Sequence, residues 1–170
     1  MITKENNMIK KINLITAALL MTMIIACGGR KDTRGEKGGF TLTSISGEQV
    51  SFTDYKGKVV VLDFFATWCG PCRSEIPHLI DIYNRNKDRG FVILGISLED
   101  EATLTSFRDQ YNITYPILLG DKEVFNQYNV SPIPHTIFFD KKGKQRKVQI
   151  GFAPQLIPEF ESLIETMLNE

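Results

Sequence analysis

The chain has 170 residues, of which 42% are hydrophobic and 10% aromatic, and this is enough to build the core of one domain. Its 20 lysines and arginines balance 20 aspartates and glutamates, so a nucleic acid or another polyanion is not expected as a partner. With three cysteines and two histidines, the chain also offers few ligands for a transition metal.

The N-terminus has the features of a secretory signal. Three lysines precede the apolar stretch 12–26, which is shorter than the ~20 residues of a comfortable membrane span. We therefore expect a signal peptide at residues 1–26. Its end, Ile24-Ile25-Ala26-Cys27, resembles a bacterial lipobox, and the resemblance implies cleavage before Cys27 and attachment of lipid to that cysteine. An ordinary signal with an incidental cysteine, or an uncleaved anchor, is the alternative.

A glycine-rich segment separates this signal from the folded domain. Residues 27–39 are expected to form the lipidated cysteine and a flexible tether, because the part after Cys27, residues 28–39, contains five glycines, six charged residues and no apolar side chain. The folded domain is expected over residues 40–170. At its start, Thr41-Leu42 and Gln49-Val50 flank the turn residues Ser46-Gly47, and this pattern predicts a β-hairpin.

The next elements alternate between buried strands and an amphipathic helix. The predominantly apolar segments Lys58 to Phe65 and Phe91 to Ile96 have the length and composition of buried strands. Between them, apolar side chains recur at the spacing of one helix face. This face consists of Ile76, Leu79, Ile80 and Tyr83.

The second half of the chain continues this alternation. We expect a helix that starts at Glu99 to Glu101, a strand at 115–119, a short helix at 122–128, strands at 136–139 and 147–150, and a closing helix. Strands that alternate with helices predict an α/β sandwich. Its mixed sheet should have about five strands, with helices on both faces.

The run Trp68-Cys69-Gly70-Pro71-Cys72 lies between the first buried strand and the first helix. A thiol at a helix N-terminus is stabilised as thiolate, so Cys69 is expected to be the attacking sulfur and Cys72, one turn further, the resolving one. Half of a zinc site is the alternative, but the chain offers no second pair of ligands at suitable spacing. A purely structural disulfide would restrict the unfolded chain little, because its loop is short.

Asp63 lies six residues before Cys69 in an otherwise apolar strand. A buried carboxylate is costly unless it is paired or protonated, so burial should raise the pKa of Asp63. The alternative is an aspartate at the strand end that reaches water.

The segment from Val59 to Cys72 resembles the thioredoxin fold. Together with the lipobox and an extra element near residues 97–129, the chain is similar to the membrane-anchored TlpA/ResA-like thiol-disulfide oxidoreductases. This resemblance covers residues 40–170. It implies a thioredoxin-like three-layer sandwich with an N-terminal hairpin and a central insert. It also implies that Asp63 matches the buried acid thought to move the proton of the inner thiol.

The resemblance also assigns residues around the dithiol. It implies that the Ile133–Pro134 bond is cis and lies against the sulfurs, where the backbone of Ile133 pairs with an extended substrate. Glu75 stands where the reductases of cytochrome c biogenesis carry a functional glutamate, although a solvated glutamate on the helix surface is the alternative. Trp68 is expected to form an exposed rim. His135 replaces the usual threonine and either stabilises a thiolate or points away.

These residues predict an exported, lipid-anchored thiol-disulfide oxidoreductase of the bacterial cell envelope, on the periplasmic side or the outer face of the cytoplasmic membrane. Gly70-Pro71 is the spacer of thioredoxin, whose potential near −270 mV favours reduction. The expected substrates are disulfides of exported proteins such as apocytochrome c. A membrane thiol donor would recharge the protein, and Cys27 would bind membrane lipid. No metal or other cofactor is expected, and the protein is expected to be a monomer.

Two other functions are compatible with a cysteine pair. A peroxiredoxin-like peroxidase needs threonine three residues before its reactive cysteine, but Ala66 occupies that position and Thr67 is one residue away. A non-enzymatic chaperone or metallochaperone would use the thiolates to bind a partner or a soft metal ion.

Overall fold

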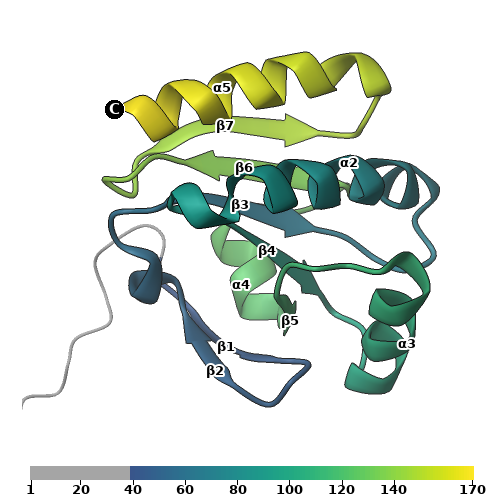
Figure 1. Ribbon diagram of the computed structural model, residues 1–170. Coiled ribbons are helices and arrows are strands. Elements are labelled where there is room, and N and C mark those ends of the chain that lie inside the picture. The colour runs from purple at the N-terminus through teal and green to yellow at the C-terminus, as the bar shows by residue number, and fades with distance from the viewer. Residues whose placement is uncertain (1–38) are drawn as a thin grey trace, which may run out of the picture. The chain divides into compact units, whose positions relative to one another are not determined.

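The computed structural model describes residues 39–170, which form one sheet covered by helices (Figure 1). The strands are β1 (Thr41–Ser44), β2 (Gln49–Ser51), β3 (Val59–Phe64), β4 (Phe91–Ser97), β5 (Ile117–Leu119), β6 (His135–Phe139) and β7 (Gln145–Ile150). The helices are α2 (Gly70–Asn86), α3 (Glu101–Tyr111), α4 (Lys122–Gln127) and α5 (Ile157–Asn169). Three short 3-10 turns, at Phe52–Tyr55, Lys87–Arg89 and Pro154–Leu156, complete the described elements. The predicted signal peptide and Cys27 lie outside the described residues.

The sheet is mixed, as predicted, but it has seven strands in the order β2-β1-β5-β4-β3-β6-β7. The expected number of about five was too low because the N-terminal hairpin joins the same sheet. Its strand β1 pairs antiparallel with β5, with Thr43 opposite Leu119. Strands β3, β4 and β5 are parallel neighbours, whereas β6 and β7 extend the sheet in antiparallel pairs.

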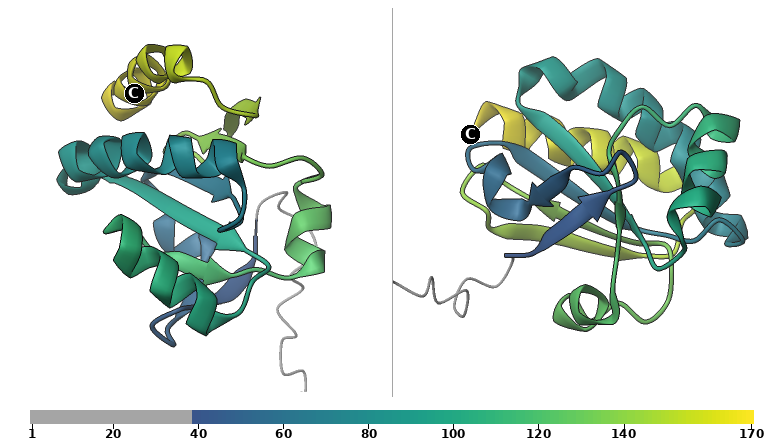
Figure 2. Two further views of the ribbon diagram at one scale, coloured as in Figure 1. Left: turned by 90° about the vertical axis from the view of Figure 1, so that its right-hand side faces the viewer. Right: turned by 90° about the horizontal axis from the view of Figure 1, so that it is seen from below.

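Helices cover both faces of this sheet. Apolar side chains of α2, α3 and α5 form one cluster on the first face, and α4 closes a second cluster on the opposite face. The views in Figure 2 show α4 and α2 on opposite sides of the strands. All six residues of β3 are buried, as expected for a strand with helices on both sides.

The side chains of β3 point alternately to the two faces of the sheet. Val60, Leu62 and Phe64 belong to the cluster on the α4 side, whereas Val59 and Val61 pack on the α2 side. Asp63 continues the second set, because side chains two residues apart share a face. Its carboxyl therefore lies beneath α2, the helix that carries the cysteine pair.

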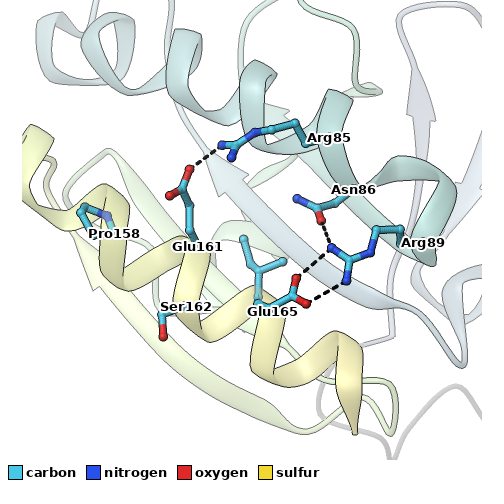
Figure 3. A pocket seen from close by; sticks show the side chains of 8 residues that line it. Arg85, Asn86, Arg89, Pro158, Glu161, Ser162 and Glu165 are labelled. Atoms are coloured by element: carbon cyan, nitrogen blue, oxygen red, sulfur yellow. Dashed lines mark hydrogen bonds and ion pairs between the residues drawn. The ribbon is translucent and has the colours of Figure 1, made fainter.

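Helices α2 and α5 lie side by side and are linked at their surface. Arg85 bonds to Glu161, and Arg89 forms a two-pronged ion pair with Glu165 at 2.8 Å and 2.9 Å (Figure 3). These pairs line a surface pocket between the two helices. Exposed ion pairs contribute little to stability, so burial of apolar side chains beneath α5 carries more of the packing energy.

The contact between Phe138 of β6 and Phe160 of α5 gives a prediction for stability. Both rings are fully buried, with centroids 4.9 Å apart. We expect Phe160→Ala to lower the free energy of unfolding by about 3–5 kcal/mol, because it leaves a cavity between α5 and the sheet. Urea denaturation measures this change. Ser162→Ala, on the exposed side of α5, is the control and should change stability by less than about 0.5 kcal/mol.

Candidate active site

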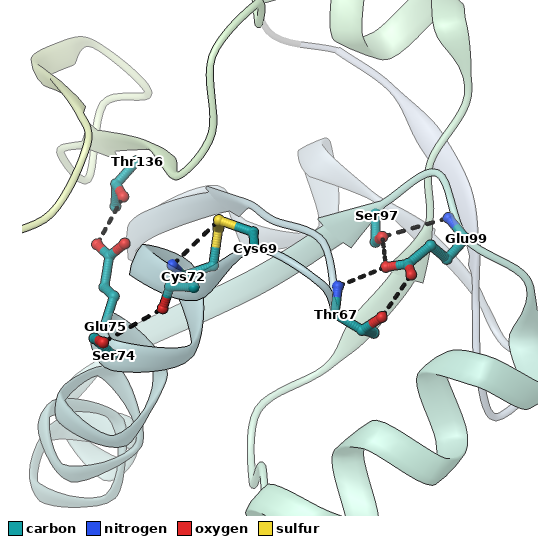
Figure 4. Close-up of a disulfide and its surroundings, with 9 residues drawn as sticks. Thr67, Cys69, Cys72, Ser74, Glu75, Ser97, Glu99 and Thr136 are labelled. Carbon is teal, nitrogen blue, oxygen red and sulfur yellow. Dashed lines mark hydrogen bonds between the residues drawn. A yellow bond between two sulfur atoms is a disulfide. The ribbon is translucent and has the colours of Figure 1, made fainter.

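The predicted cysteine pair forms a disulfide at the start of α2. Cys69 is the N-cap residue of this helix, and the Cys72 N–H donates to its sulfur at 3.2 Å (Figure 4). A sulfur in this position lies in the field of the helix N-terminus, which favours the thiolate. Cys72 lies in the first turn and is more deeply buried than Cys69. The geometry thus gives the two sulfurs different surroundings.

The residues around the disulfide form the outer surface of this end of the sheet. Gly70 and Pro71 are exposed, and the Trp68 side chain is 74% exposed, so the predicted rim orientation of Trp68 is confirmed. Pro71 occupies the first turn of α2, where the missing N–H would have no helical partner in any case. An exposed indole beside a disulfide offers a flat apolar contact for a docking chain.

The loop before Trp68 is attached to the neighbouring strand by Glu99. The carboxylate of Glu99 accepts hydrogen bonds from Thr67 N–H at 2.7 Å, from Thr67 Oγ1 at 2.6 Å and from Ser97 Oγ at 3.2 Å (Figure 4). Ser97 is the last residue of β4. We call these three residues the Glu99 clamp. The sequence pattern predicts Glu99 only as the start of a helix, and no local signal indicates its contact with Thr67.

The Ile133–Pro134 peptide bond is cis, as predicted. It directly precedes β6, whose first residue, His135, pairs with Phe64 at the end of β3. Because β3 and β6 are antiparallel, the start of β6 lies at the same edge of the sheet as the loop that leads from β3 to Cys69. The Pro134 carbonyl accepts a hydrogen bond from Gly151 N–H at 2.8 Å, which fixes this segment to the turn after β7.

A row of polar side chains crosses the sheet beneath α2. In the strand register, Asp63 lies between Gly95 of β4 and Thr136 of β6. The Thr136 hydroxyl donates to Glu75 of α2 at 2.9 Å (Figure 4). Asp63 is 1% exposed and Glu75 is 0% exposed, so neither carboxyl reaches water. The alternatives of a solvated Glu75 and of a water-exposed Asp63 are both wrong, because each side chain faces the core between α2 and the sheet.

Burial changes the acidity of both carboxyls. It raises the pKa of Asp63 well above its usual range, and the nearby charge of Glu75 adds to this effect. Burial also raises the pKa of Glu75 to about 7, although the hydrogen bond from Thr136 opposes the change. Glu75 follows Cys72 by three residues on the buried side of α2, so the two side chains are neighbours on one helix face. The site therefore holds an ionisable carboxyl near neutral pH beside the inner sulfur.

His135 lies on the other side of the sheet. Its side chain is 3% exposed, and its ring packs edge-on against Phe64 with centroids 6.1 Å apart. Because neighbouring strand residues face opposite sides, His135 points away from the face that receives Thr136. Burial lowers the pKa of His135, which favours the neutral ring. Of the two interpretations of this residue, the structure supports the one in which it points away.

The described residues form neither a metal site nor a membrane-spanning helix. Within 39–170, no three histidine, cysteine, aspartate or glutamate side chains are arranged to hold a metal ion. No helix in the same range is both long and apolar enough to cross a membrane.

A cysteine pair at the helix N-terminus, a cis-proline at the same sheet edge and a buried acid beneath them define a thioredoxin-fold protein with a dithiol-disulfide centre. Solved structures agree with this class. A thiol:disulfide interchange protein from Chlorobium tepidum has a TM-score of 0.70 and 28% identity, covering 77% of this chain and 94% of its own. The thioredoxin domain of a thiol-disulfide oxidoreductase from Bacteroides vulgatus has a TM-score of 0.68 and 29% identity, covering 76% and 96%.

The chain belongs to the AhpC/TSA family, which matches residues 37–148. Its relatives include the thiol-disulfide oxidoreductases ResA of Bacillus subtilis, 33% identical over 74% of this chain and 72% of that protein, and of Halalkalibacterium halodurans, 35% identical over 74% and 73%. The ResA protein of Geobacillus kaustophilus is 35% identical over 66% of each chain. These relatives place the chain among the thiol-disulfide oxidoreductases.

The raised pKa of Glu75 predicts a pH-dependent stability. A carboxyl whose pKa rises from 4.5 to about 7 on folding stabilises the fold below pH 4.5, and this stabilisation is lost as the pH rises through 7. We expect the free energy of unfolding to fall over this window by roughly 3 kcal/mol. Urea denaturation at several pH values should show a flatter dependence for Glu75→Gln and a still flatter one for Asp63→Asn/Glu75→Gln. Equal slopes in all three proteins would contradict the burial argument.

The Glu99 clamp predicts a second stability effect. Hydrogen bonds to a charged group contribute about 1.5–3 kcal/mol each, and the Glu99 carboxylate receives three of them in a half-buried position. We expect Glu99→Ala to lower the free energy of unfolding by roughly 2–3 kcal/mol. Glu48→Ala, at an exposed turn residue, is the matched control and should change stability little. Thermal denaturation of the three proteins side by side gives the comparison.

Proposed function

We propose that the protein reduces disulfide bonds in exported proteins while it is held at a membrane by lipid on Cys27. The observation that carries this proposal is the Cys69–Cys72 disulfide at the N-terminus of α2, with Cys69 nearer the surface and Cys72 buried. A sulfur at this helix end is the better nucleophile, and a buried neighbour three residues on can resolve a mixed disulfide.

The reaction follows from this arrangement of the sulfurs. In the reduced protein, the Cys69 thiolate attacks one sulfur of a substrate disulfide, and a mixed disulfide forms as the other substrate sulfur leaves and takes up a proton. Cys72 then loses its proton and attacks the Cys69 sulfur. The second substrate sulfur leaves and takes up a proton, and the Cys69–Cys72 disulfide forms again. Two electrons have passed from the protein to the substrate.

The proton of Cys72 needs an acceptor during the second step. Glu75 lies one helical turn from Cys72 and has a pKa raised to about 7, which suits a general base at neutral pH. Asp63 lies on the same face of the sheet, and its negative charge would disfavour ionisation of both carboxyls together. We therefore propose that the proton of Cys72 passes to one of these two carboxyls, Asp63 and Glu75, which we call the carboxyl pair.

Substrate binding is assigned to the exposed surface around the disulfide. Trp68 offers an apolar face on one side, with Gly70 and Pro71 next to it. Ile133 and cis-Pro134 lie at the same sheet edge, where a backbone segment can pair with an extended chain. This surface suits a flexible polypeptide that presents a disulfide, such as apocytochrome c.

The direction of electron flow is the second part of the proposal. Gly70-Pro71 is the spacer of thioredoxin, a reducing couple near −270 mV, whereas strong oxidants lie near −120 mV. A reductase outside the cytoplasm must be recharged, so a membrane thiol donor is a required partner. The protein would act as a monomer in the bacterial cell envelope, on the periplasmic side or the outer face of the cytoplasmic membrane, and would need no metal or other cofactor.

Substitution of the two cysteines tests this function. Insulin disulfide reduction should be measurable for the reduced wild type and absent for Cys69→Ser, because the attacking sulfur is gone. Cys72→Ser should instead hold its substrate as a mixed disulfide that survives denaturing gels without reductant. Cys27→Ser is the control for the anchor and should keep full activity in solution while it loses membrane association. A wild type without reductase activity would refute the proposal.

A peroxidase is the rival that shares the cysteine chemistry. Its reaction needs a threonine hydroxyl three residues before the reactive sulfur, but Ala66 occupies this position and the Thr67 hydroxyl donates to Glu99. A metallochaperone would instead show tight binding of copper or zinc by the thiols. Peroxide consumption with a thiol donor, or stoichiometric metal binding, would favour these alternatives.

A further inference from the structure

Tyr115 is a buried tyrosine whose hydroxyl has no role in the reaction described so far. Its side chain is 3% exposed, in the segment directly before β5. Within residues 39–170, its oxygen has no hydrogen-bond partner. Buried tyrosine hydroxyls usually have one, because an unpaired polar group costs free energy in an apolar environment. The placement of this hydroxyl therefore needs an explanation.

The Tyr115 ring lies over Gly95, beside Asp63. A Cβ atom added to Gly95 would meet Cε2 of Tyr115 and Cε1 of Phe65, each at 3.2 Å, so both rings border the space that the glycine leaves open. Gly95 lies opposite Asp63 in the parallel pairing of β4 with β3. Residues opposite each other in a sheet point to the same face, so the Tyr115 ring and the Asp63 carboxyl share the face beneath α2.

The carboxyl pair is short of hydrogen-bond donors. Thr136 donates to one oxygen of Glu75, but both oxygens of Asp63 and the second oxygen of Glu75 have no partner among the described residues. No lysine or arginine is buried anywhere in 39–170, so no cation compensates the pair there. Among the other titratable groups, Tyr83 has its ring centroid 6.0 Å from that of Tyr115, and Cys72 belongs to the same buried cluster as Tyr115. His135 faces the opposite side of the sheet.

We propose that Tyr115 is a positioning residue whose hydroxyl donates a hydrogen bond to the carboxyl pair when the pair is ionised. The hydroxyl thereby sets the pH at which the pair accepts the proton of Cys72. Burial and the charges of Asp63 and Glu75 raise the pKa of Tyr115 well above its usual range, so the hydroxyl keeps its proton and remains a donor at neutral pH. This inference rests on the proposed function of the carboxyl pair.

Tyr115→Phe tests the inference because it removes the hydroxyl and keeps the ring. Loss of a donor to a carboxylate disfavours the ionised form, so the pH profile of the resolving step should move to higher pH by about one unit. The single tryptophan, Trp68, directly precedes Cys69 and provides a fluorescence signal for oxidation of the reduced protein by a disulfide peptide. Stopped-flow measurement between pH 5 and pH 9 gives the profile.

Tyr83→Phe is the matched control. Tyr83 is a half-buried tyrosine whose ring lies next to that of Tyr115. Tyr83→Phe therefore removes a nearby hydroxyl that is not proposed to donate to the carboxyl pair. Its profile should coincide with that of the wild type. Identical profiles for Tyr115→Phe and the wild type would overturn the inference, as would an equal shift in both variants.

Infrared titration of the protonated carboxyl band gives a readout that does not depend on catalysis. The band should persist to higher pH in Tyr115→Phe than in the wild type, by the same amount as the kinetic shift. If the wild type reduces no disulfide, the proposed function fails, but this titration still decides whether Tyr115 acts on the carboxyl pair. An unchanged band in an active protein refutes the role of Tyr115 alone.

Discussion

The geometry of the site depends on the position of β3 between a parallel neighbour, β4, and an antiparallel neighbour, β6. The parallel pairing puts the ends of β3 and β4 at one edge, where Glu99 attaches the loop that leads to Cys69. The antiparallel pairing brings the start of β6, and with it cis-Pro134, to the same edge. One strand arrangement therefore assembles three segments that are distant in sequence around one disulfide.

The same arrangement places two carboxyls in the core between α2 and the sheet. Burial of an ionised carboxyl without a cation costs free energy. The pKa values of Asp63 and Glu75 are raised because burial disfavours their ionised forms. A core selected for stability alone would place apolar side chains there. Glu75 lies one turn from Cys72, and Asp63 lies on the sheet face beneath the same helix, so this cost supports our proposal that the carboxyls serve proton transfer at the inner sulfur.

The local elements of this fold could be predicted from the sequence because their signals are local. The hairpin turn, the apolar run of β3 and the helix that follows the cysteine pair each lie within one short segment. Contacts between distant segments had no such signal. The pairing of β1 with β5, the Thr67–Glu99 contact and the position of Tyr115 over Gly95 depend on sheet order, which periodicity does not encode. The burial of Glu75 stayed undecided because an acidic residue on a helix is usually solvated.

The surroundings of one sulfur favour its ionisation, and the surroundings of the other oppose it. The Cys69 sulfur accepts a hydrogen bond from the Cys72 N–H at a helix terminus, which stabilises a thiolate, whereas Cys72 is buried in an apolar cluster one turn from Glu75, which disfavours one. Strong stabilisation of the reduced thiolate makes a dithiol an oxidant, as in DsbA. Here no buried lysine or arginine within 39–170 adds to the helix field, so the reduced form gains only part of that stabilisation. These electrostatics support our proposal that the dithiol gives up its electrons to a substrate, as does the Gly70-Pro71 spacer.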